Sequence, residues 1–246
     1  MKTILTRRTI RHYKDTEVPD TTLNRLLNEA ARTQTMGNLQ LYSVVVTRDQ
    51  KMKEKLAPAH FNQPMVTEAP VVLTICADFR RTTVWCDNRK ADAGYDNFLS
   101  FMNAATDALL YTQTFCNLAE EEGLGCCYLG TTVYMPQAII ETLQLPKLVM
   151  PVATITLGWP DENPPLTDRL ATEAFVHQET YHDYTPALID RFYEEKESLP
   201  ENQEFVKINH KETLAQVFTD CRYTRKDNEA MSEGLLKALR AQGFLE

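Results

Sequence analysis

The hydrophobic pattern in the first half of the chain changes between helical and strand periods. After Asp20, apolar residues recur at spacings of three and four from Leu23 to Ala31, which predicts a helix with Asp20 as its N-cap. The β-branched and aromatic run Leu41–Val46 predicts a strand. The nearly continuous apolar run Val71–Cys76 predicts a second strand, buried on both faces.

A longer periodic segment extends from Asn97 to Glu122 and predicts the longest helix of the chain. Because apolar residues occupy more than one of its sides, this helix is expected to be central or to lie at a subunit interface. Gly123 and Gly125 are suitable residues for ending it. The other predicted elements are a helix at Asp49–Ala57, a short strand or turn at Cys126–Leu129, a helix from Pro136, a strand at Val152–Leu157, and weaker helices at 187–197 and 228–239. Strands and helices alternate, so a mixed α/β domain is expected.

Composition narrows the classes of function. The 246 residues include 26 Lys and Arg against 34 Asp and Glu, a formal net charge of −8, which disfavours a nucleic-acid binder because a phosphate backbone needs a basic surface. No apolar run is long enough to span a membrane, and residues 1–13 lack the apolar stretch of a signal peptide, so a cytoplasmic protein is expected. The six cysteines are then expected to be free, buried thiols. Adjacent Cys126 and Cys127 are expected to pack, with redox chemistry as the less favoured alternative.

Several enzyme motifs are absent. The chain has no G-x-S-x-G, H-E-x-x-H or G-x-x-x-x-G-K sequence, which disfavours a serine hydrolase, a zinc protease of that type and a P-loop protein. Gly123-Leu-Gly125 lacks the third glycine of a dinucleotide fingerprint, because Tyr128 stands there. His177 and His182 lie near acidic residues and could ligate a metal, but a solvated face is the favoured interpretation and no metal is expected.

The N-terminal segment is basic in an otherwise acidic chain. Five basic residues precede the first acidic one: Lys2, Arg7, Arg8, Arg11 and Lys14. If the segment is helical, Arg7 and Arg11 share a face and repel each other unless an anion compensates them. Arginine suits phosphate because its planar fork donates several hydrogen bonds, and Thr9 adds a hydroxyl. A solvated basic face or carboxylate partners are the alternative.

A polar loop, Thr33–Gln40, joins the first predicted helix to the first predicted strand. It is rich in amide and hydroxyl side chains, and Gly37 allows close approach of the backbone to another group. Loops held by regular elements often bind ligands. On these residues alone, a ligand-binding loop and a plain connecting turn are both open.

Taken together, these segments resemble the FMN-dependent nitroreductase family. Arg7–Tyr13 (RRTIRHY) is similar to the family's R-S-I-R-x-F/Y opening, and Thr35–Val46 is similar to its S-x-x-N-x-Q loop and the strand after it. Glu68–Pro70, Glu122–Gly130 and Leu157–Pro160 are also similar, in the family's order. The resemblance extends over roughly residues 3 to 170, and the tail resembles the larger oxygen-insensitive NADPH nitroreductase and flavin reductase group.

The resemblance implies an α+β fold, a nitroreductase-like three-layer sandwich in which helices flank a central mixed, mainly antiparallel sheet. It implies an intertwined homodimer with one FMN in each site between the chains. Residues 1–170 would form the FMN-binding core, and residues 171–246 would form a C-terminal helical extension that wraps the core or the partner subunit. Neither a nucleic acid nor a membrane is expected as a partner.

The resemblance also implies which residues bind FMN, and it implies no catalytic acid or base among the side chains. The implied cofactor-binding residues are Arg7, Arg8, Thr9, Arg11, Thr35, Gly37, Asn38, Gln40, Gln63, Tyr128, Leu129, Gly130, Thr131 and Arg169. Arg169 matches the arginine of the family's K-x-R element, but the lysine position holds Thr167. A lysine near the flavin N1–O2 edge would stabilise reduced, anionic FMN, so Thr167 leaves the reduction potential an open question.

The implied activity is that of an NAD(P)H-dependent oxidoreductase with a ping-pong mechanism. NADPH or NADH would give hydride to FMN, which would then reduce a nitroaromatic, a quinone or a flavin in the same shallow site. Two alternatives stay open, since a fold does not decide a function. One is a flavin reductase that supplies a partner, and the other is a flavin-binding dimer with a regulatory role.

Overall fold

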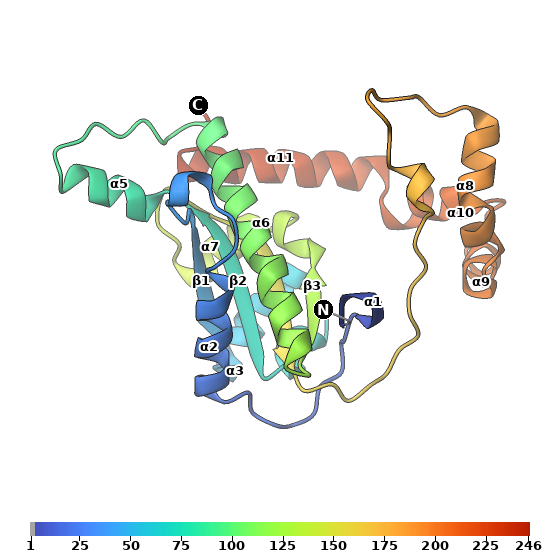
Figure 1. The fold of residues 1–246 in the computed structure, drawn as a ribbon, viewed down its shortest axis with the longest axis horizontal. Helices are drawn as coiled ribbons and strands as arrows, with labels where there is room; N and C mark the ends of the chain where they lie inside the picture. The colour runs from blue at the N-terminus through green and yellow to red at the C-terminus, as the bar shows by residue number, and fades with distance from the viewer. Residues whose placement is uncertain (1–2) are drawn as a thin grey trace. The chain divides into compact units, whose positions relative to one another are not determined.

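The structure, a computed structural model, describes residues 3–246 and consists of two compact units (Figure 1). The first unit contains the residues up to Pro165 together with Met231–Glu246, and the second contains Leu166–Ala230. The expected boundary at residue 170, between a core and an extension that wraps it, stays a prediction.

Figure 1 labels most of the helices and strands. The strands of the first unit are β1 (Tyr42–Thr47), β2 (Val71–Asp78), β3 (Gly125–Leu129) and β4 (Val149–Gly158). Its helices are α1 (Thr3–Thr6), α2 (Asp20–Ala30), α3 (Gln50–Leu56), α4 (Met65–Glu68), α5 (Arg80–Asp87), α6 (Phe98–Glu121) and α7 (Pro136–Leu143), with the 3₁₀ turns η1 (Met36–Asn38), η2 (Ala57–His60) and η3 (Gly130–Val133). The second unit contains η4 (Thr172–Ala174), α8 (Pro186–Ser198), α9 (Pro200–Ile208), α10 (Leu214–Val217) and the π-helical turn η5 (Phe218–Arg222). Helix α11 (Arg225–Gln242) begins in the second unit and ends in the first.

The strands form one antiparallel sheet in the order β1-β2-β4-β3. The central strands β2 and β4 are buried along their whole length, as the apolar run Val71–Cys76 predicts for β2. β1 and β3 form the two edges, and a parallel bridge joins Thr9 to Cys126 beside β3. The expected α+β fold with a mainly antiparallel central sheet is confirmed.

Helices cover both faces of this sheet. On one face, buried residues of α2 and α6 such as Leu26 and Phe115 form one apolar cluster with residues of the central strands such as Ile155. On the other face, a second cluster joins residues of α3, α4 and α7, including Leu56, to Leu129 of β3. Successive side chains of a strand point to opposite faces, so a single sheet supports both clusters.

Helix α6 is central, as its apolar pattern predicts. Asn97 is its N-cap and accepts a hydrogen bond from the backbone N–H of Ser100 at 3.0 Å. One side of the helix is buried against the sheet and α2. Another side stays exposed although it is apolar, with exposed fractions between 42% and 70% for Leu99, Met102, Leu109 and Leu110.

Two local expectations are wrong, and two helices escaped prediction. Asp20 is not the N-cap of α2, because Pro19 holds that position and the Asp20 carboxylate pairs with Arg48 at 3.0 Å. The helical option for Arg7–Tyr13 fails, because the segment is extended and pairs with the edge of the sheet. Helices α5 and α9 were not predicted, because their mainly polar sequences show little apolar periodicity.

Two glycines allow the N-terminal segment to lie against the sheet. A Cβ at Gly125 would lie 2.6 Å from the Cβ of Ile10, and a Cβ at Gly158 would lie 2.8 Å from Cδ1 of Tyr13. Both distances are too short for two carbon atoms that are not bonded. Only a residue without a Cβ therefore allows Ile10 and Tyr13 to pack as they do.

Candidate functional site

The predicted site residues of the N-terminal segment lie along the edge of β3. The bridge between Thr9 and Cys126 and the hydrogen bond from the Ile10 N–H to the Cys126 carbonyl oxygen, at 3.1 Å, hold this segment in place. Arg7, Arg8 and Arg11 are thereby brought to one edge of the sheet. Lys2, which belongs to the same basic cluster, lies outside the described residues.

Arg7 has a partner within the chain. Its Nε atom lies 3.3 Å from Oε1 of Glu120, whose side chain is only 9% exposed. Burial raises the pKa of Glu120, and the charge of Arg7 opposes that rise. For Arg7, the alternative of a carboxylate partner is therefore the one that the structure supports.

The guanidinium groups of Arg8 and Arg11 form no ion pair with a carboxylate among residues 3–246. The Arg8 guanidinium donates to two neutral acceptors, the carbonyl oxygens of Pro164 at 2.6 Å and Thr6 at 2.8 Å. Among the described residues, the Arg11 guanidinium has no hydrogen-bond or ion-pair partner; only its backbone N–H donates, to the Glu162 carboxylate. A cavity of about 220 Å³ opens beside this segment.

A second group of predicted residues continues from the end of β3 into η3. Tyr128 is 47% exposed, and a Cβ added at Gly130 would meet no atom within 4 Å. Leu129 is buried, and the Thr131 hydroxyl lies 2.8 Å from Nδ1 of His60. The edge of β3 therefore offers an open surface directly beside the basic segment.

His60 links two of the predicted residues. Its ring contacts Thr131, and its carbonyl oxygen accepts hydrogen bonds from the backbone N–H of Gln63 at 3.2 Å and from Nε2 of the same residue at 3.1 Å. Burial lowers the pKa of His60 to about 4, so the ring is neutral near neutral pH. Nε2 of His60 is buried without a partner among the described residues. The sequence alone does not indicate the contact between His60 and Thr131, because the two residues are 71 positions apart.

The polar loop is held by α6 and does not lie at the edge of β3. Asp107 of α6 accepts hydrogen bonds from the backbone N–H groups of Met36 at 2.8 Å and Leu41 at 3.0 Å, which bracket the loop. Between these anchors lie the predicted residues Gly37, Asn38 and Gln40, with Thr35 just before them. Asp107 was missed in the sequence, although an acidic residue inside the apolar stretch of a buried helix is a usable signal of a polar partner.

The loop and the basic segment do not meet within one chain. The loop is bound to Asp107 and Arg7 to Glu120, and these two acidic residues are thirteen positions apart on α6. At 1.5 Å per residue, they are separated by about 20 Å along the helix. β1, which follows the loop, and β3 are moreover opposite edges of the sheet.

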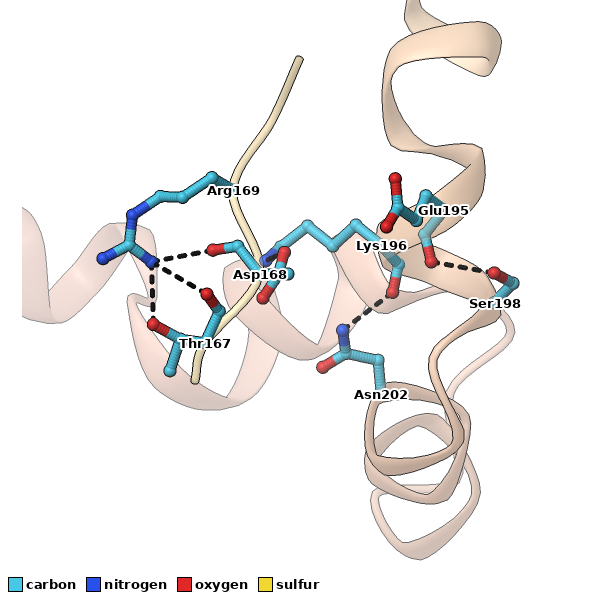
Figure 2. A network of polar contacts seen from close by, with 7 residues as sticks. All are labelled: Thr167, Asp168, Arg169, Glu195, Lys196, Ser198 and Asn202. Atoms are coloured by element: carbon cyan, nitrogen blue, oxygen red, sulfur yellow. Dashed lines mark hydrogen bonds and ion pairs between the residues drawn. The ribbon is translucent and has the colours of Figure 1, made fainter. Parts of the chain in front are cut away.

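Arg169 belongs to the second unit, where it is exposed and bound locally. Figure 2 shows its guanidinium turned toward the preceding residues, where Nη1 donates to Oγ1 of Thr167 and to the carbonyl oxygen of Asp168, both at 2.7 Å. The Asp168 carboxylate pairs with Nζ of Lys196 at 2.7 Å. Thr167, the departure from the family's K-x-R element, thus serves as an acceptor for Arg169.

The second unit also contains His177 and His182, the two histidines that lie near acidic residues in the sequence. The His182 N–H donates to Nδ1 of His177 at 3.2 Å, and the Tyr184 hydroxyl lies 3.4 Å from Nε2 of the same ring. Both ring nitrogens of His177 are therefore in contact with protein groups. Across residues 3–246, no group of three or more His, Cys, Asp and Glu side chains is placed to hold a metal ion.

The cysteines are free, and all except the exposed Cys221 are buried. A hydrogen bond to Cys116 and burial raise the pKa of Cys126 well above its ordinary value, and burial raises that of Cys127. Such thiols react slowly, since the thiolate is the nucleophile. These observations support the packing interpretation of the adjacent pair. No helix in the described part of the chain is long and apolar enough to cross a membrane.

Comparisons with known proteins agree with this fold. The model of the Nitroreductase family matches residues 4–159. The oxygen-insensitive NADPH nitroreductase of Salmonella typhimurium is 31% identical over 188 residues, 76% of this chain and 77% of that protein. The FMN reductase (NAD(P)H) of Bacillus subtilis is 32% identical over 183 residues, 74% of each. The crystal structure of a presumed oxidoreductase from Bacteroides fragilis is 60% identical, with a TM-score of 0.99 over 100% of both chains. The chain therefore belongs to the nitroreductase family.

Proposed function

We propose that this protein is an FMN-dependent NAD(P)H oxidoreductase that reduces nitroaromatics, quinones or flavins by two electrons in a ping-pong mechanism. The names of its relatives, an oxygen-insensitive NADPH nitroreductase and an FMN reductase, support a flavin oxidoreductase. The observation on which the proposal depends is the edge of β3. There the basic segment, which carries the unpaired Arg11, is bridged to a strand that leads into the exposed Tyr128 and the open position at Gly130.

The groups at this edge fit FMN. Arg8 and Arg11 suit its phosphate, because neither guanidinium is paired with a carboxylate among the described residues. The open space at Gly130 and the exposed ring of Tyr128 suit the flat isoalloxazine ring. Arg7 instead holds the segment in place through Glu120, so it contributes to the site indirectly.

A second copy of the chain would complete the site. The polar loop lies about 20 Å along α6 from the basic segment, so one chain does not bring the two together. The exposed apolar stripe of α6, which includes Leu99, Met102 and Leu109, is a surface suited to a second copy. An intertwined homodimer with one FMN in each site between the chains accounts for both features.

The side chains of this site bind and orient, and none is assigned as a catalytic acid or base. FMN, when bound, supplies the two-electron chemistry, accepting hydride from NAD(P)H and passing the electrons to the acceptor. Arg8 and Arg11 would bind its phosphate, and Leu129 and Thr131 would form the wall of the site beside its ring. Arg169, whose guanidinium is exposed in the second unit, is proposed to contribute a further contact.

The first test is the visible spectrum of the purified protein, followed by anaerobic addition of NADPH. A yellow protein that bleaches, and that then oxidises NADPH with menadione or a nitrofuran, supports the proposal. Bleaching with turnover only when free FMN is the acceptor would favour a flavin reductase. A protein that binds FMN without any turnover would favour a regulatory role, and a protein that stays colourless with added FMN would refute the assignment.

A further inference from the structure

The span of the polar loop is held by one buried carboxylate. Asp107 is 0% exposed, and its two oxygen atoms accept hydrogen bonds from the backbone N–H of Met36, within the loop, at 2.8 Å and from that of Leu41, directly after the loop, at 3.0 Å. Hydrogen bonds to a charged acceptor are stronger than those between neutral groups. The buried carboxylate therefore fixes the distance between Met36 and Leu41.

A cation holds the carbonyl groups of the same loop. Nη2 of Arg81, from α5, donates to the carbonyl oxygen of Leu39 at 3.3 Å and to that of Gln40 at a shorter distance. The N–H groups of the loop thus face an anion, and its carbonyl groups face a cation. Both partners lie outside the loop, Asp107 on α6 and Arg81 on α5.

The loop needs this support because its backbone is intrinsically unfavourable. Gly37, Asn38 and Gln40 have φ values of 55°, 57° and 50°, in the left-handed region. A residue with a Cβ adopts this region at a cost, which Asn38 and Gln40 both incur. Such conformations persist only where the surrounding structure over-determines them.

In this conformation the loop presents unpaired polar groups. Nε2 of Gln40 donates to the carbonyl oxygen and to Oδ1 of Asn38, both at 2.8 Å. Within residues 3–246, the Asn38 amide nitrogen, the Gln40 amide oxygen and the Thr35 hydroxyl are left without a hydrogen-bond partner. One donor, one acceptor and one hydroxyl are thus available to a ligand that itself has both N–H and C=O groups.

We infer that Asp107 is a positioning residue for FMN binding and acts together with Arg81. By holding Gly37, Asn38 and Gln40 in the left-handed conformation, it keeps the free groups of Thr35, Asn38 and Gln40 ready for the flavin in the site shared with the partner subunit. Asp107 itself is buried and does not touch the flavin. The inference rests on the proposed function, since it takes FMN as the ligand of this loop.

Asp107→Asn tests the inference directly. The amide keeps one acceptor oxygen but sets an NH₂ group against the other backbone N–H, so one end of the loop is released. We expect amide hydrogen exchange at Met36 or Leu41 to accelerate. We also expect the FMN dissociation constant to rise about tenfold, because a hydrogen bond to a charged group is worth at least that factor. The absorption spectrum of bound FMN should shift, since it reports on the groups around the ring.

Thr112→Val is the matched control for this variant. Thr112 is also fully buried on α6, but its hydroxyl donates only to the Ala108 carbonyl oxygen of the same helix, at 2.7 Å. Its loss is expected to lower the thermal midpoint while changing FMN affinity by less than about twofold. A purely structural role for Asp107 would instead make both variants lose FMN affinity in proportion to their loss of stability.

Arg81→Gln provides an independent test if Asp107→Asn does not fold. Arg81 is exposed, and the neighbouring Arg80 is also exposed but has no hydrogen-bond or ion-pair partner among the described residues, so Arg80→Gln is its control. Arg81→Gln is expected to weaken FMN binding severalfold, and Arg80→Gln is expected to leave it unchanged.

The outcomes separate the inference from the function on which it rests. A wild-type protein that does not bind FMN would overturn both. A wild type that binds FMN, with Asp107→Asn and Arg81→Gln binding it equally well, would overturn the inference alone. Weaker binding confined to these two variants, and absent from Thr112→Val and Arg80→Gln, would support it.

Discussion

Acid should destabilise this protein through one buried imidazole. His60 is 0% exposed, its Nδ1 lies 2.8 Å from the Thr131 hydroxyl, and its Nε2 is buried without a partner among residues 3–246. Burial lowers the pKa of His60 from 6.5 to about 4, since the charged ring would lose its hydration. In the unfolded chain the same ring keeps its ordinary pKa, so the unfolded state binds more protons between these two values.

Stability therefore falls as the pH is lowered through this window. At 1.36 kcal/mol per pKa unit, the pKa difference between the folded and unfolded states corresponds to a loss of about 3 kcal/mol in the free energy of unfolding. This loss is almost absent at pH 7 and nearly complete at about pH 4. This amount is a large part of the roughly 5–15 kcal/mol by which a folded domain is stable. A single side chain can thus set the acid limit of the first unit.

The assay compares wild type with His60→Gln, which removes the titrating group and keeps a polar side chain beside Thr131. Urea unfolding of both proteins, with FMN at the same concentration, gives the free energy of unfolding at pH 7 and pH 4. Carboxylates that titrate in both proteins cancel in the difference. From pH 7 to pH 4, we expect the free energy of unfolding of the wild type to fall by about 3 kcal/mol more than that of His60→Gln. A difference that stays constant would refute a buried, neutral His60.

Three further predictions concern the basic segment, the sheet edge and α6. Arg11→Gln should raise the FMN dissociation constant about tenfold in a fluorescence titration. Arg7→Gln should mainly lower the free energy of unfolding, because it leaves the buried carboxylate of Glu120 unpaired. Equal effects of the two variants on FMN binding would contradict the separate roles of Arg11 and Arg7. Gly125→Ala should destabilise by about 1–3 kcal/mol in urea unfolding through overpacking, and Gly94→Ala, which meets no atom within 4 Å, should not. Asn97→Ala should cost about 1 kcal/mol in thermal unfolding followed by circular dichroism, because α6 loses its N-cap; an unchanged midpoint would mean that this cap is dispensable.

The elements that could be predicted from the sequence are those whose burial shows in a local pattern. The run Val71–Cys76 is a buried central strand, and Asn97 caps the long helix that its apolar period predicts. In both cases, neighbours within a few residues determine the structure. The polar helices α5 and α9 lacked such a pattern and were missed.

The ends of elements and the basic segment depended on distant partners. Asp20 has the side chain of a good N-cap, but its carboxylate pairs with Arg48 instead. Arg7–Tyr13 would repel itself as a helix, and the structure avoids this by placing the segment in extended form against Cys126. No window around residue 10 contains that information, because Cys126 is more than a hundred positions away.

Local patterns in the sequence were enough to predict the buried strands, the long central helix, a cluster of arginines and a polar loop with a glycine. Which arginine is neutralised became visible only in the folded chain, where Glu120 contacts Arg7 from 113 positions away. The folded chain also shows that the loop is held by Asp107, about 20 Å along α6 from the basic segment. The physical reason is that apolar periodicity acts between neighbours within a turn or a strand. The partners of charged and polar groups, by contrast, depend on the order of the strands and on the contacts of α6, which packs across them.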